Sequence, residues 1–217
     1  MPFCVPGAPP NTDYPAYPHV VRNPSTQTDI KLPMNMTALA PGEQSILESL
    51  DAAIRVPRSA AILAAVVDEV SAELAAKSNA RLAWRPIPLE TYDRLPDGIA
   101  SSWVFVLRAD CTSGAERHPN SIQRFMSYRG SADMQTWNGQ EWVSHVLSSD
   151  PQAPMQERWL SIPTNVWHRP VMGAGDWVVV SFHTAADDQL IEERPRNDEN
   201  PDRGLISGAL YAGRQAR

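Results

Sequence analysis

The chain has 217 residues, of which 42% are hydrophobic, a formal net charge of −6 and a pI near 5.3. This length can bury the core of one main domain with appendages. The acidic balance gives no general positive field for a phosphate backbone, so we expect no binding to nucleic acid. The two cysteines make no disulfide framework, and no signal peptide or membrane-spanning apolar run is found. We therefore expect a cytoplasmic protein with no membrane partner.

The N-terminal part of the chain changes character near residue 42. Residues 1–42 are rich in proline, which disfavours helix and strand alike, and we predict an extended arm there, or a mobile tail. Residues 43–80 are predicted to be helical, with Pro57 dividing them into two helices. The second helix carries an apolar stripe formed by Ile62, Leu63, Val66, Val67, Val70 and Leu74.

From residue 81 the sequence consists of short runs rich in Trp, Val, Phe and Tyr. Asn138-Gly139 between two runs predicts a hairpin, and Gly130 marks another tight connection. Strands that follow each other without intervening helices indicate an antiparallel sandwich or barrel, which we assign to residues 81–187. Residues 188–217 are charged at first and are expected to form a solvated C-terminal tail.

Two histidines stand in frames of defined spacing. The first frame is Glu116-x-His118, then four residues, Gln123, six residues and Gly130. It resembles the first motif of the cupin family, in which His-x-His, a Glu and a Gly follow at similar intervals. The spacing is kept, whereas Glu116 and Gln123 depart from the family's residues.

The second frame is Pro163-x-Asn165-x-x-His168, which resembles the second cupin motif, Pro-x-Gly-x-x-His. Asn can supply the turn conformation that Gly usually gives, because Asn tolerates positive φ. The resemblance covers residues 85–185, about half of the chain. It implies a mainly β protein: a cupin-like antiparallel β-barrel (a double-stranded β-helix) preceded by the helical segment.

The resemblance also implies a metal site formed by His118, His168, Glu116 and Gln123. Side chains alternate across a strand, so alternate residues of two distant segments can converge inside a barrel. Two imidazoles and a carboxylate suit non-haem Fe(II), and the same donors can hold Zn, Mn or Ni. Gln123 is the weakest of these ligands because its amide oxygen is neutral. The alternative is structural, with His118 bonded to loop backbone and His168 packed on an aromatic ring.

Three further residues are candidates for substrate binding. Phe125 and Ser127 would share the inward face of Gln123, and His183 would face the same side as Ser181. Arg124 would point the other way, and we expect it to be solvated.

We predict a metal-dependent enzyme of the cupin type, an oxygenase such as a dioxygenase or an isomerase/lyase, with a small polar metabolite as substrate. One alternative is a non-catalytic cupin that binds a small molecule or serves as a dimeric structural module. Another is an interaction protein built around the helical segment. The proline-rich arm and the seven tryptophans would give a surface that a second copy could cover, so we expect a homodimer.

Overall fold

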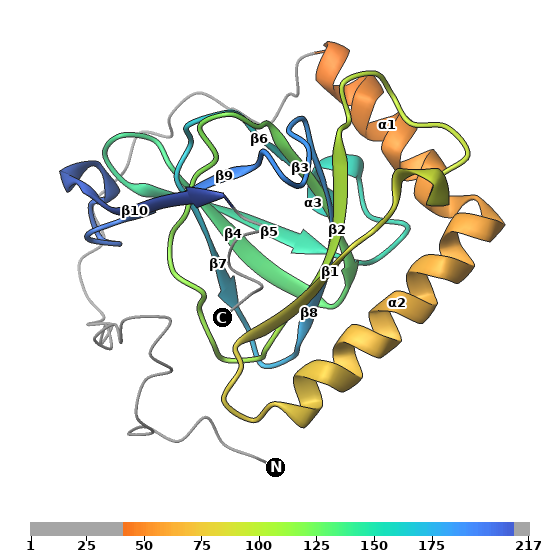
Figure 1. Cartoon of the computed structure of the whole chain (residues 1–217), viewed down its shortest axis with the longest axis horizontal. Helices are drawn as coiled ribbons and strands as arrows, with labels where there is room; N and C mark the ends of the chain where they lie inside the picture. The colour runs from red at the N-terminus through yellow and green to blue at the C-terminus, as the bar shows by residue number, and fades with distance from the viewer. Residues whose placement is uncertain (1–40, 211–217) are drawn as a thin grey trace.

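A computed structural model describes residues 41–210, so almost all of the predicted N-terminal arm lies outside the described residues. Two helices open the described chain, α1 (Pro41–Arg55) and α2 (Pro57–Ala76). The break falls where it was predicted, because Pro57 takes the first turn of α2, where its missing N–H is not needed. Figure 1 shows α1 and α2 along one side of the β structure. None of the helices within residues 41–210 is both long and apolar enough to cross a membrane.

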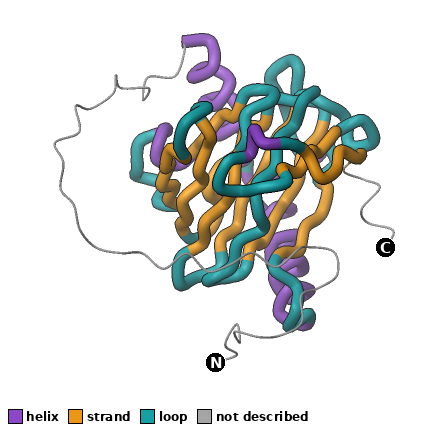
Figure 2. The backbone as a smooth tube through the Cα atoms, turned by 90° about the vertical axis from the view of Figure 1, so that its left-hand side faces the viewer, coloured by secondary structure: helices purple, strands orange, loops and turns teal. Residues whose placement is uncertain are grey.

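The rest of the described chain is mainly antiparallel β structure, which confirms the predicted fold class. A five-stranded sheet has the order β1-β2-β8-β3-β6, and a three-stranded sheet has the order β5-β4-β7. Figure 2 shows the strands side by side at the centre of the molecule. The strands of the two sheets are β1 (Leu82–Pro86), β2 (Ser101–Leu107), β3 (Gln123–Arg129), β4 (Ser131–Trp137), β5 (Trp142–Ser148), β6 (Trp159–Ile162), β7 (His168–Met172) and β8 (Trp177–His183).

Two apolar clusters pack against the five-stranded sheet, one on each of its faces. Strand β8 is buried along its whole length because it contributes to both. Val178 and Val180 pack with the helices, whereas Trp177 and Val179 pack with the three-stranded sheet inside the barrel. The inward set of β8 continues to Ser181 and His183, so one end of the barrel interior is polar.

The C-terminal region is not the solvated tail that its charges suggested. Residues 191–210 form an antiparallel pair, β9 (Ile191–Pro195) and β10 (Leu205–Leu210), and β9 also bridges to Arg117. Glu192 is only 1% exposed. That carboxylate tolerates burial because Arg194 donates a hydrogen bond of 2.7 Å to it. The prediction was wrong because such partners are not visible in a local charge pattern.

Arg124 corrects a second expectation. Its side chain points away from the barrel interior as predicted, but it is only 5% exposed, because α1 covers that face of the sheet. Glu43 accepts hydrogen bonds of 2.6 and 3.0 Å from the guanidinium. This bond with Arg124 lowers the pKa of Glu43, despite its partial burial.

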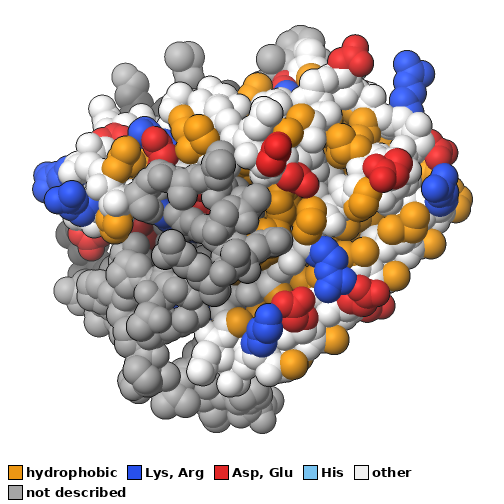
Figure 3. All heavy atoms as spheres, viewed as in Figure 1, with side chains coloured by type: hydrophobic (Ala, Val, Ile, Leu, Met, Phe, Trp, Pro, Cys, Tyr) orange, Lys and Arg blue, Asp and Glu red, His pale blue; other side chains and the backbone are white. Residues whose placement is uncertain are grey.

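Acidic residues of α2 also pair with arginines of the strands. Arg85 pairs with Glu69 and Glu73, and Arg129 lies 3.2 Å from Asp68. Figure 3 shows acidic and basic side chains interspersed on this face of the molecule. These pairs are exposed, so we assign them little stability.

Gly130 connects β3 and β4 as predicted, with a φ of +83°. A Cβ added there would lie 2.7 Å from the carbonyl oxygen of Asp176, which is backbone and cannot move aside cheaply. We expect Gly130→Ala to lower the free energy of unfolding by about 3 kcal/mol, of which about 1 kcal/mol is backbone strain. Urea unfolding measures this difference.

Gly98 provides the matched control, because its φ is also +83° and no atom lies within 4 Å of the added Cβ. Gly98→Ala should therefore show the backbone strain alone, about 1 kcal/mol. Equal losses in the two variants would contradict the close approach at Asp176.

Candidate metal centre

The candidate site is assembled by a short antiparallel bridge between the loop before β3 and the start of β7. Glu116 and His168 exchange both backbone hydrogen bonds, of 2.9 and 2.8 Å. Asn165, with a φ of +64°, turns the chain into β7 and donates its backbone N–H to the carbonyl of His118. The two sequence frames therefore lie side by side, and Asn165 has the positive φ that was predicted for it.

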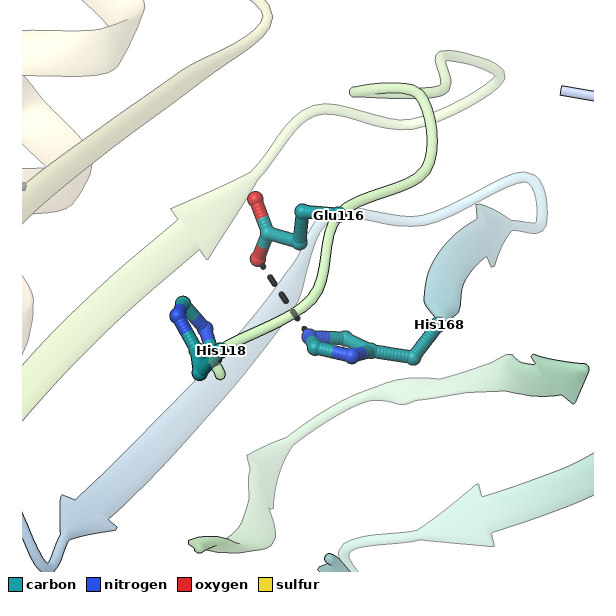
Figure 4. Close-up of side chains that lie close together, drawn as sticks. All are labelled: Glu116, His118 and His168. Atoms are coloured by element: carbon teal, nitrogen blue, oxygen red, sulfur yellow. Dashed lines mark ion pairs between the residues drawn. The ribbon is translucent and has the colours of Figure 1, made fainter. Parts of the chain in front are cut away.

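The side chains of Glu116, His118 and His168 converge at this bridge (Figure 4). One ligand atom from each lies within 4.8 Å of the others. The two imidazole centroids are 5.4 Å apart, and His168 Nε2 lies 3.5 Å from Glu116 Oε1. Both histidines are buried. Two imidazoles and a carboxylate in this arrangement can hold a divalent transition metal.

Backbone carbonyls orient both imidazole rings. His118 Nδ1 lies 2.9 Å from the oxygen of Ile191, and His168 Nδ1 lies 3.1 Å from the oxygen of Val166. A carbonyl only accepts, so each Nδ1 carries a proton, and in the neutral form of either ring the lone pair lies on Nε2. Nε2 of His168 is buried and makes no hydrogen bond. This is the orientation that ligating histidines take in metal sites.

The charge at the site is set by Arg194 of β9, which donates a 2.7 Å hydrogen bond to Glu116 Oε2. Burial alone would raise the pKa of Glu116, but the Arg194 charge and the nearby His168 hold it well below its usual range. Burial lowers the pKa of His118 to about 4, which outweighs the opposing effect of Glu116. Burial also lowers the pKa of His183 well below its ordinary value. At neutral pH the site therefore holds an ionised Glu116 beside His118 and His183, which burial keeps neutral.

These shifts make the metal-free protein sensitive to acid. The pKa of His118 falls from an ordinary 6.5 to about 4 on folding, so between these values the unfolded chain binds more protons than the folded one. Stability should therefore fall as the pH falls from 6.5 towards 4, by about 3 kcal/mol for this residue. Urea unfolding with a chelator present, repeated across this range, measures the slope.

His118→Gln should flatten that dependence by up to about 1.4 kcal/mol per pH unit, the contribution of one proton. His183 has the same sign, so part of the slope should remain. An unchanged slope in the variant would show that His118 is not held neutral by burial.

The structure also brings Gln123 and His183 close to the site. They face each other across β3 and β8, and the His183 ring lies edge-on to the His118 ring at 5.2 Å. Phe125 packs against Trp177 in the apolar cluster, and Ser127 accepts a 2.8 Å hydrogen bond from that indole. Substrate contact with Phe125 and Ser127 stays a prediction.

Two residues beside the site were missed in the sequence, Glu192 and Arg194. Both lie on β9, two positions apart, so they share one face of the strand. Arg194 also donates to the carbonyl oxygens of Ser113 and Ala115, which fixes the loop that carries Glu116. The available signal was an acid and a base two positions apart, at residues 192 and 194, which a strand places on one face.

No protein-family model matches the sequence, and no curated protein matches it. Solved structures do match in part. The capsular polysaccharide assembling protein CapF from Staphylococcus aureus is 18% identical, with a TM-score of 0.40 over 50% of this chain and 29% of CapF. A pumpkin pro-11S globulin is 18% identical, with a TM-score of 0.41 over 54% of this chain and 29% of the globulin. An oxalate oxidase bound to glycolate is 14% identical, with a TM-score of 0.38 over 48% of this chain and 51% of the oxidase.

The mainly β, antiparallel fold is shown by the sheets of the chain itself, whereas the resemblance to cupins rests on the two sequence frames and stays a prediction. The chain spans about half or less of the length of each of these three proteins. At TM-scores near 0.4 the matches carry no argument about activity. The antiparallel sheets and the site described above carry the functional argument instead.

Proposed function

We propose that the chain is a metal-dependent enzyme of the cupin type that acts on a small polar molecule, as an oxygenase or an isomerase/lyase. One observation carries this proposal: Glu116, His118 and His168 place three ligand atoms within 4.8 Å of one another in a buried site. Burying two imidazoles and a carboxylate together is costly unless they have partners, and a divalent cation would provide one.

Fe(II) is the metal we favour, because two histidines and one carboxylate leave open positions for substrate. The same donors can hold Zn, Mn or Ni. When bound, the metal would act as a Lewis acid and, if it is iron, would supply redox chemistry with O2.

The chain's own residues prepare the site for this chemistry. Arg194 occupies Oε2 of Glu116, which leaves Oε1 on the side of His168. The carbonyls of Ile191 and Val166 fix the imidazole tautomers. Such surrounding contacts typically contribute 10- to 100-fold in metal affinity.

A second candidate function is a non-catalytic cupin that binds a small molecule. The ion pair between Arg194 and Glu116 favours it, because the carboxylate already has a compensating charge without a metal. A homodimer remains a prediction for either function, and light scattering of the purified protein tests it.

Metal analysis of protein purified without a metal-binding tag tests the main proposal. We expect a stoichiometric transition metal, or stoichiometric uptake of Fe(II) by chelator-treated protein under anaerobic conditions. Protein that neither carries nor takes up Fe(II), Zn, Mn or Ni would leave the second candidate in place.

A further inference from the structure

A cavity of about 70 Å³ lies beside the candidate metal centre. Glu116 and Gln123 line it, together with an apolar wall that includes Trp84, Phe105, Met134 and Trp177. A buried water needs about 10–15 Å³ of such space, so the cavity has room for roughly five waters or one small ring. Glu116 and Gln123 make one end of the cavity polar. The rest of its wall is apolar and favours an apolar molecule.

Gln123 is the polar residue of this cavity whose hydrogen bonds are incomplete. It is only 8% exposed, and its Nε2 donates to Ser181 Oγ at 3.3 Å. Its Oε1 is buried and has no hydrogen-bond partner. A buried acceptor left without a donor costs about 1–3 kcal/mol, so a partner from outside the chain would be favourable.

Which end of the amide faces the cavity is set by a row of hydrogen bonds that begins at Ser121. The hydroxyl of Ser121 donates to the carbonyl of Ile122 at 3.1 Å and accepts the backbone N–H groups of Thr184 and Ala185. It therefore has no proton left for Nδ1 of His183, which lies 3.5 Å away. A protonated Nδ1 can share that oxygen as a third, long donor, whereas an unprotonated Nδ1 would face it with no proton between them, so the neutral His183 ring carries its proton on Nδ1.

The proton position on His183 fixes which atom donates in the next two hydrogen bonds, to Ser181 and to Gln123. Since Nδ1 of His183 is protonated, Nε2 accepts the hydroxyl proton of Ser181 at 3.1 Å. Ser181 Oγ, having given its proton to His183, can only accept from the amide. The NH2 group of Gln123 is therefore held towards Ser181, and the carbonyl oxygen is the end left for the cavity.

We infer that Gln123 presents its carbonyl oxygen as a fixed hydrogen-bond acceptor, and that the cavity binds a small neutral molecule with an apolar body and one hydroxyl or N–H donor. This deepens the proposed function, because it names the substrate class of the same site and assigns Gln123 to the substrate rather than to the metal. The row of Ser121, His183 and Ser181 acts as a positioning network for that acceptor.

The charged residues of the cavity do not favour an anionic substrate. Arg194 is engaged by Glu116, Glu192 and the carbonyls of Ser113 and Ala115. The hydrogen bonds of the guanidinium are thus directed to the two carboxylates and to the loop that carries Glu116. A carboxylate or phosphate would meet two acidic side chains in addition to that one base.

Phenol and fluorobenzene form a matched pair of probes, because they have equal numbers of non-hydrogen atoms and only phenol carries a donor. Chelator-treated protein labelled at the methionine methyl groups should show both probes by a shift of the Met134 signal, since Met134 lines the cavity. We expect phenol to bind about tenfold more tightly than fluorobenzene, the effect of one well-placed hydrogen bond. No shift at Met134, or equal affinities, would overturn the inference.

Gln123→Met keeps the volume and removes the acceptor, so the preference for phenol should fall to within about twofold while fluorobenzene binding is retained. Ser181→Ala should also reduce the preference, because the amide loses its anchor. Gln140→Met, at an exposed position, is the control and should keep the tenfold preference for phenol.

Titration with Fe(II) separates this inference from the proposed function. Gln123→Met should bind the metal as wild type does, and a loss like that of a histidine variant would make Gln123 a metal ligand and overturn the inference. A wild-type protein that prefers phenol but takes up no metal would refute the metal-dependent function and leave the inference standing.

Discussion

His168→Ala is expected to lower the affinity for a divalent metal by about 100-fold or more, because it removes one of two imidazole ligands. Its Nε2 is the buried, unpartnered nitrogen of the cluster. The metal-free variant should remain folded, with the free energy of unfolding lowered by at most about 2 kcal/mol, since the apolar clusters are untouched. Metal content and calorimetric titration measure the loss, and activity should disappear with the metal.

His145→Ala is the matched control. His145 lies on β5 and its Nε2 bonds to Thr136 at 2.8 Å, outside the group of candidate ligands. Its removal should leave the metal affinity unchanged. Retention of metal by His168→Ala would refute the proposed centre, and loss in both variants would point to a general effect on the fold.

Arg194→Met should be strongly destabilising in the metal-free protein. The arginine bonds to both Glu116 and Glu192, at 2.7 Å each. Without it, both carboxylates would lose this cationic partner, and removing one partner of a buried pair typically costs about 3–5 kcal/mol. We expect a loss of about 3 kcal/mol in urea unfolding. Added Zn²⁺ should restore part of it, because a cation beside Glu116 supplies the missing positive charge.

Arg117→Met provides the comparison, because its partner Glu193 is the neighbour of Arg194 on β9. Arg117 pairs with Glu193 at 2.6 Å and lies over the Trp167 ring, but it serves one carboxylate where Arg194 serves two, and its side chain is 25% exposed against 12%. The loss should therefore be smaller than at Arg194, below about 2 kcal/mol. Equal losses at Arg117 and Arg194 would contradict the special role of the Glu116 network. A loss at Arg194 without any rescue by metal would argue against a cation site at Glu116.

The sequence allowed the barrel strands and the meeting of the two histidines to be predicted, for different physical reasons. The strands carry β-branched and aromatic residues between turn residues such as Asn138-Gly139, which is a local signal. His118 and His168 lie 50 positions apart, and only their frames, with the turn at Asn165, indicated that they meet.

What could not be predicted depends on partners that are distant in sequence. Charges such as those of Arg194 and Arg124 usually face solvent, and nothing local shows that Glu116 or Glu43 will meet them. The inward direction of Gln123 followed from strand parity, whereas its unpaired oxygen depends on the orientation set by Ser181 and His183.

The contribution of β9 to the centre has a consequence for biosynthesis. Glu116 and His118 depend on Arg194 and on the carbonyl of Ile191, which follow them by more than 70 positions. Closing such long-range contacts comes late in folding. During translation the two histidines leave the ribosome before β9 does, so the contacts that orient the candidate centre cannot all form until β9 has emerged.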